Sequence, residues 1–244
     1  MSATMIHETY FMPDTSLRDA RPEDDVQPEM LPSLSSRTIS LHSAISVHGW
    51  DFFDGRKVWY EAELEQNFAL VLAMRRDVVE IAEQPPAVTY LDDHGRKCPH
   101  TFDFRVKLTT GSTGLVAVKP AALVAKTGVD RVVELIAEQI SPSLADWTLL
   151  FTDMDLSLTD LLNAKVIHHA RRDPWPQDDA VITRLIRNLK REITIGELAG
   201  RSGLGGYAFE AIVRAIADGK LKPVEYGTLD DNLAVVAAKR KRKA

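Results

Sequence analysis

The spacing of apolar side chains changes along the chain from helical to strand-like and back, and this change predicts an α/β fold. Between residues 59 and 75 apolar side chains recur at helical spacing, namely Leu64, Phe68, Val71 and Leu72. Short apolar or alternating runs typical of strands follow at residues 78–81, 87–91, 100–108 and 115–118. A hairpin turn at 92–95, Asp-Asp-His-Gly, separates two of these runs. We therefore expect one helix followed by a meander of strands.

The pattern then alternates again, with a helix expected at 129–140, a strand at 147–152 and a helix at 158–170. Together with the preceding elements, these complete an α/β core over residues 41–172. Residues 1–40 precede the core, are rich in Pro, Ser, Asp and Glu, and have no sustained apolar period. We interpret them as a flexible acidic arm.

Two prolines, Pro174 and Pro176, end the last core helix and introduce a second unit over residues 177–235. Helices are expected at 179–190, 195–202 and 207–218, with a capping box formed by Thr194 and Glu197 at the start of the middle one. Two short helices around a glycine-containing turn predict a helix-turn-helix domain, and residues 221–225 are suited to the start of a wing. Residues 236–244 form a basic tail.

Charge is distributed unevenly over the chain. The net charge of the whole chain is −5, but residues 1–183 hold 17 Lys+Arg against 28 Asp+Glu, and residues 184–244 hold 13 against 7. This asymmetry favours DNA contact in the C-terminal part, with a merely solubilising basic end as the alternative. Around the expected recognition helix, the candidate phosphate contacts are Arg201, Tyr207 and Arg214.

Other bulk properties narrow the cellular setting. The sequence contains no apolar run of the roughly 18 residues that a membrane span needs, and its acidic start does not resemble a signal peptide. Cys98 is the only cysteine, which excludes an internal disulfide and fits a reducing compartment. We therefore expect a cytoplasmic protein.

Three charged residues on successive elements form the candidate chemistry: Glu65 on the first helix, Asp103 on a strand and Lys119 after the next strand. Taken singly, each is most simply a solvated charge. As a set, they fit phosphodiester hydrolysis, in which carboxylates hold Mg²⁺ and a lysine orients the attacking water or stabilises phosphate charge. We therefore predict Glu65, Asp103 and Lys119 as catalytic residues, with Glu65 and Asp103 as metal ligands.

Four ordered segments carry a family resemblance: Tyr60-Glu61-Ala62-Glu63-Leu64-Glu65, Val78-Val79-Glu80-Ile81-Ala82-Glu83-Gln84-Pro85, His100-Thr101-Phe102-Asp103-Phe104 and Val116-Ala117-Val118-Lys119-Pro120. They resemble the TnsA-type endonuclease subunits of heteromeric transposases, a branch of the PD-(D/E)XK restriction-like nucleases. The resemblance implies a restriction-endonuclease-like core with a central mixed sheet flanked by helices. It also implies Mg²⁺ (or Mn²⁺) as cofactor, with the backbone oxygen of Val118 as a further ligand.

The same resemblance implies partners and a setting. The substrate would be double-stranded DNA at transposon ends, nicked on one strand. The partners would be a DDE-type transposase subunit and an AAA+ ATPase regulator, in a bacterial cytoplasm and in association with the nucleoid.

One departure from the family pattern keeps alternatives open. Ala117 stands where the family usually carries an acid, two residues before the lysine, although Glu61 lies one turn from Glu65 and offers a second carboxylate. We favour an active enzyme with few metal ligands. The alternatives are a catalytically degenerate DNA-binding adaptor, a nuclease of the same fold in defence or repair, and a plain transcription regulator.

Overall fold

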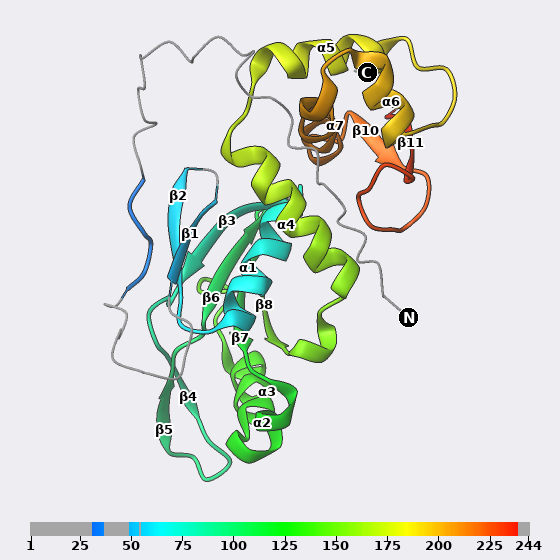
Figure 1. Ribbon diagram of the computed structural model, residues 1–244. Coiled ribbons are helices and arrows are strands. Elements are labelled where there is room, and N and C mark those ends of the chain that lie inside the picture. The colour runs from blue at the N-terminus through cyan, green and yellow to red at the C-terminus, as the bar shows by residue number, and fades with distance from the viewer. Residues whose placement is uncertain (1–30, 37–48, 54, 239–244) are drawn as a thin grey trace, which may run out of the picture.

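The computed structural model describes residues 31–36, 49–53 and 55–238 (Figure 1). The expected acidic arm over 1–40 and basic tail over 236–244 lie largely outside this range. None of the helices within the described ranges is both long enough and apolar enough to cross a membrane.

The core is built on a mixed four-stranded sheet in the order β3-β6-β7-β8 (Figure 1). Its strands are β3 (Val78–Glu83), β6 (Phe104–Leu108), β7 (Thr113–Val118) and β8 (Trp147–Phe151). The β3/β6 and β6/β7 pairs are antiparallel, whereas β7 and β8 are parallel. Because β6 begins at the edge where β7 ends, residues just before β6 and just after β7 lie at the same end of the sheet.

Helices cover both faces of this sheet, which confirms the α/β prediction. On one face lie α1 (Glu63–Met74) and α4 (Leu158–Arg172), and on the other lie α2 (Ala121–Thr127) and α3 (Val129–Gln139). Alternate residues of β7 therefore enter different clusters, since side chains alternate across a strand. Val116 and Val118 pack with α1, whereas Leu115 and Ala117 pack with α3.

The first helix begins later than the sequence predicts. Trp59 and Tyr60 belong to strand β2 (Arg56–Tyr60), which pairs with β1 (Gly49–Phe53) in an antiparallel hairpin. Val58 and Tyr60 are buried while Trp59 is partly exposed, so the local period is two and not 3.6. α2 was not predicted either, and it has no buried residue that would create an apolar stripe.

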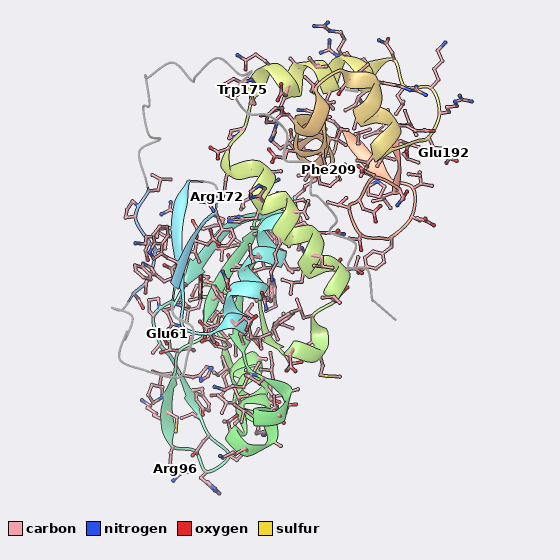
Figure 2. All side chains as sticks on the ribbon, viewed as in Figure 1. Glu61, Arg96, Arg172, Trp175, Glu192 and Phe209 are labelled. Atoms are coloured by element: carbon pink, nitrogen blue, oxygen red, sulfur yellow. The ribbon has the colours of Figure 1, made fainter. Side chains whose placement is uncertain are left out.

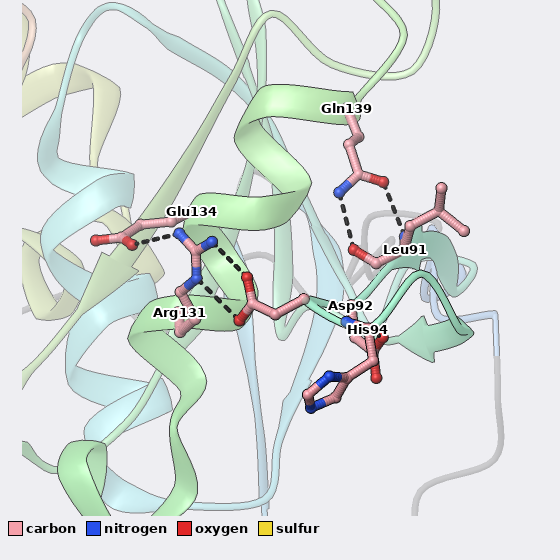
Figure 3. A network of polar contacts seen from close by, with 7 residues as sticks. Leu91, Asp92, His94, Arg131, Glu134 and Gln139 are labelled. Carbon is pink, nitrogen blue, oxygen red and sulfur yellow. Dashed lines mark hydrogen bonds and ion pairs between the residues drawn. The ribbon is translucent and has the colours of Figure 1, made fainter.

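The strand expected at 100–108 is two strands. β5 (Lys97–His100) pairs with β4 (Val88–Leu91), and β6 starts only at Phe104. Figure 3 shows how α3 holds this hairpin: the Gln139 side chain exchanges two hydrogen bonds with the Leu91 backbone, of 2.8 and 2.9 Å. Arg131 pairs with Asp93 of the same turn at 2.6 Å. The turn end of the hairpin is thereby fixed against α3, at the end opposite to His100.

Residues 176–238 form the C-terminal unit. Its elements are α5 (Pro176–Arg187), β9 (Ile193–Thr194), α6 (Ile195–Ser202), α7 (Ala208–Ala217), β10 (Leu221–Pro223) and β11 (Ala234–Ala237). The strands form an antiparallel sheet in the order β10-β11-β9. The predicted capping box at α6 is confirmed, because Thr194 and Glu197 bond to each other's backbone N–H groups. The described residues also include two 3₁₀ turns, η2 (Asp153–Asp155) in the core and η3 (Gly205–Tyr207) in the C-terminal unit.

The helix α4 belongs to both units (Figure 1). Its Ala164 packs into the cluster between α1 and the sheet, whereas Ile167 and Ala170 pack into the cluster of the C-terminal unit. Met74 at the end of α1 touches both clusters. The core and the C-terminal unit therefore share one continuous packed interior.

Candidate active site

Glu65, Asp103 and Lys119 lie on three elements that meet at one end of the sheet. Glu65 is in the first turn of α1, Asp103 lies in the bend just before β6, and Lys119 directly follows β7. The Oδ2 atom of Asp103 accepts a hydrogen bond of 2.7 Å from the Val118 backbone N–H. This bond holds the Asp103 carboxylate against the residue that precedes Lys119.

The bend at Asp103 results from how its two aromatic neighbours pack. Phe102 and Phe104 are both fully buried, but Phe102 belongs to the cluster on the α3 face and Phe104 to the cluster on the α1 face. A continuous strand would place residues two apart on the same face. The chain must therefore turn at Asp103, which leaves this residue at the edge of the sheet and only half-buried.

The charges of the three residues act on one another. Glu65 is only 9% exposed, and burial together with the negative charge of Asp103 raises its pKa from 4.5 to about 7. The positive charge of Lys119 acts in the opposite direction, as does the Glu61 backbone N–H, which donates a bond of 2.7 Å to Glu65 Oε2. The mutual repulsion of the two carboxylates favours a bound proton or other cation, and the positive charge of Lys119 reduces this effect.

The metal-ligand set in the described residues is small. They contain no group of three or more His, Cys, Asp or Glu side chains arranged to hold an ion. The Val118 carbonyl points to the same side of its strand as the Val118 N–H, which faces Asp103. Glu65, Asp103 and this carbonyl fit Mg²⁺, which needs only one or two carboxylates and takes its remaining ligands from water and phosphate.

Ala117 lies on the α3 face of the sheet. Its side chain is 3% exposed and belongs to the apolar cluster of Phe102, Leu115 and the buried face of α3. A carboxylate at this position would be surrounded by hydrocarbon on the side of the sheet opposite α1. The alanine therefore fits its surroundings in this chain.

His100 is a polar residue of this region that the sequence interpretation missed. Its ring lies edge-on to Phe102, with the centroids 4.8 Å apart, and its Nε2 is buried without a hydrogen-bond partner in the described structure. Burial and the positive charge of Lys119 lower its pKa from 6.5. A histidine three residues before the strand acid was the available signal, but the break between β5 and β6 was not visible in the apolar pattern.

No protein-family model matches this chain, and no curated protein is significantly similar to it.

The three candidate phosphate contacts of the C-terminal unit differ in exposure. Arg201, in the last turn of α6, is exposed, and Tyr207 of η3 is half-buried. Arg214 is 6% exposed; its Nε donates to Asp179 Oδ1 and its Nη1 donates to the Ala170 carbonyl, both at 2.8 Å. The expectation that Arg214 contacts phosphate is therefore corrected, because this guanidinium joins α7 to α4 and α5 in the protein interior.

Proposed function

We propose that this protein is the DNA endonuclease subunit of a heteromeric transposase and hydrolyses one phosphodiester strand at transposon ends. The observation that carries the proposal is the meeting of Glu65, Asp103 and Lys119 at one end of the sheet, where Asp103 is bonded to the residue before Lys119. Two acids and a lysine, from a helix, a strand end and the next strand end, suit metal-assisted phosphodiester hydrolysis, since carboxylates can hold the ion and a lysine can stabilise phosphate charge.

The finer description of the fold is part of the same proposal. A mixed sheet between helices is compatible with a restriction-endonuclease-like core. The order of helix, strand, two helices and two strands in the C-terminal unit agrees with a winged-helix domain of the helix-turn-helix class. We propose a DDE-type transposase and an AAA+ ATPase regulator as partners because the sequence motifs resemble those of TnsA-type subunits.

Each residue has a defined task in this mechanism. Glu65 and Asp103, with the Val118 carbonyl, would hold Mg²⁺ or Mn²⁺, which supplies charge neutralisation at the scissile phosphate and a more acidic water. Lys119 places its positive charge beside the scissile phosphate, where it orients the attacking water or stabilises the phosphate oxygens. The Val118 N–H keeps the Asp103 carboxylate in place.

The decisive experiment uses the full chain with its partner transposase, the ATPase regulator and DNA that carries transposon ends. We expect strand nicking with Mg²⁺ or Mn²⁺, and its loss in Asp103→Asn and in Lys119→Ala. Lys126→Ala, an exposed lysine of α2, is the matched control and should cut like the wild type. Uncut DNA with the wild type, or normal cutting by Asp103→Asn, would contradict the proposal.

Ala117 favours a second candidate, a catalytically degenerate adaptor that keeps the fold for binding DNA and protein. Because Ala117 supplies no carboxylate, the predicted metal ligands have only two, those of Glu65 and Asp103. An adaptor predicts that Lys119→Ala leaves transposition in cells intact, whereas the nuclease predicts its loss.

A further inference from the structure

Helix α7 occupies the position of the recognition helix in the C-terminal unit, but it is covered by protein. Seven of its 10 residues are buried: Ala208, Ala211, Ile212, Val213, Arg214, Ala215 and Ala217. Five of them (Ala211, Ile212, Val213, Ala215 and Ala217) belong to the cluster that includes Ile167 and Ala170 of α4 and Ile182 and Ile186 of α5. A helix enclosed in this way cannot enter the major groove, which admits a helix only by an exposed face.

The remaining surface of α7 is also unsuited to DNA. Phe209 and Ile216 are partly buried apolar residues, and Glu210 carries a negative charge that would repel phosphate. Any duplex bound by this unit must therefore be held by another element.

Four exposed cations of the unit lie close together on α5 and the segment after it, whereas Arg201, Lys220 and Lys222 are exposed elsewhere in the unit. Arg184, Arg187, Lys190 and Arg191 lie within eight residues, and all are exposed. Positions three or four apart share one helical face, so Arg184 and Arg187 project together. Figure 2 shows nitrogen-tipped side chains extending outward from α5 and from the segment towards Glu192.

These cations differ from four arginines of the core. Arg75, Arg96, Arg105 and Arg131 each form an ion pair with a carboxylate. Within the described part of the chain, Arg184, Arg187, Lys190 and Arg191 form none. Uncompensated positive charge on one face attracts a polyanion and releases its counterions when that polyanion binds.

The surroundings of the cations indicate which polyanion fits. The apolar side of α5 faces inward, since Ile182 and Ile186 are buried and Leu185 packs against the same cluster. No large hydrophobic residue between positions 176 and 191 is exposed. A membrane-surface helix needs an exposed apolar face, and a protein interface needs an apolar or aromatic anchor. A phosphate backbone needs only the cations.

We propose that the outward face of α5, with Lys190 and Arg191, binds the phosphate backbone of duplex DNA in place of α7. The choice of DNA rests on the proposed function, and the binding itself requires no cleavage. Contact through phosphates alone predicts that binding is nearly independent of base sequence.

The test measures the affinity of the full chain for duplex DNA in EDTA by fluorescence anisotropy, over a range of salt concentrations. The variant is Arg184→Gln, Arg187→Gln and Arg191→Gln combined, and the control is Lys97→Gln, Lys107→Gln and Lys126→Gln, three exposed lysines of the core. For the variant we expect affinity at low salt to fall about tenfold or more, and the slope of log K against log salt to decrease by about 3. The control should keep the wild-type slope.

Thermal unfolding of both variants should match the wild type, because all six side chains are exposed. Wild-type affinity and slope in the α5 variant would overturn the proposal. The proposal would also be overturned if the α5 variant lost binding to anionic vesicles or to polyglutamate but bound DNA like the wild type. Because EDTA prevents cleavage, this assay measures binding alone. If the protein binds DNA through α5 in EDTA but does not cut it when Mg²⁺ is added, the proposed nuclease function is refuted and the binding proposal stands.

Discussion

At the scale of single residues, Glu65 has the clearest physical signature. Its carboxylate is removed from water and faces Asp103, so its protonated form is favoured and its pKa rises to about 7. In the absence of a cation, the site therefore holds a proton that an arriving cation can replace. Metal binding at this position should release protons near neutral pH.

A pH-dependent stability follows from the same shift. The folded pKa of about 7 exceeds the ordinary value of 4.5, so the folded state binds the proton more tightly and stability falls as pH rises between these values. The full shift corresponds to about 3 kcal/mol. Glu65→Gln should thus gain stability over the wild type above pH 7 by up to this amount and gain little below pH 4.5.

Urea denaturation in EDTA across this pH range measures the effect. Glu63→Gln, an exposed acid of the same helical turn, is the control and should show no such trend. A stability difference between Glu65→Gln and the wild type that stays constant with pH would contradict the assigned environment of Glu65.

The sequence could indicate which residues matter here, but not how they are enclosed. The order of acid, acid and lysine along the chain is sufficient to select Glu65, Asp103 and Lys119 from the sequence alone. Charge and spacing carry no information on burial by distant segments, so Arg214 was expected on the surface. His100 was missed because the opposed packing of Phe102 and Phe104 depends on which helix covers each face of the sheet.

At the scale of elements, one buried guanidinium connects three helices. Arg214 of α7 bonds to Asp179 of α5 and to the Ala170 carbonyl of α4. Arg214→Ala should lower the free energy of unfolding by about 3–5 kcal/mol, because it leaves a partly buried carboxylate and a carbonyl without their partner.

Chemical denaturation monitored by circular dichroism provides the measurement. Arg201→Ala, which removes an exposed arginine of α6, should change stability by no more than about 0.5 kcal/mol. Equal effects of the two substitutions would show that the Arg214 contacts contribute nothing.

Elements with a strong apolar period were predictable, and those without one were not. α3, α4 and α6 appear close to the predicted residues because each buries one regular stripe. The β1–β2 hairpin was missed because its alternating residues run directly into the helical pattern of α1. α2 was missed because it buries no side chain and so leaves no stripe in the sequence.

At the scale of the whole molecule, α4 makes the two units interdependent. Ending the chain after Arg172 would uncover Ile167 and Ala170, which are 5% and 1% exposed in the full protein. We expect such a fragment to lose cooperative unfolding and to aggregate, and the full chain to unfold in a single calorimetric transition.

Removal of residues 239–244 alone is the control and should leave the transition unchanged. A truncated chain that stays soluble and keeps the melting temperature of the full protein would show that α4 is not shared in the way described. Pro174 and Pro176 did indicate where the second set of helices begins. They could not indicate that α7 packs on α4, since an amphipathic pattern gives the apolar face of a helix but not its neighbour.

The continuity of α4 has a consequence for distance. A helix of 15 residues is about 22 Å long and does not bend easily. If DNA rests on α5, a rigid α4 keeps the phosphate presented to Glu65, Asp103 and Lys119 at a constant separation from the anchored phosphates. The rigid connection between the two units, and not the bases between, would then select the bond that is broken.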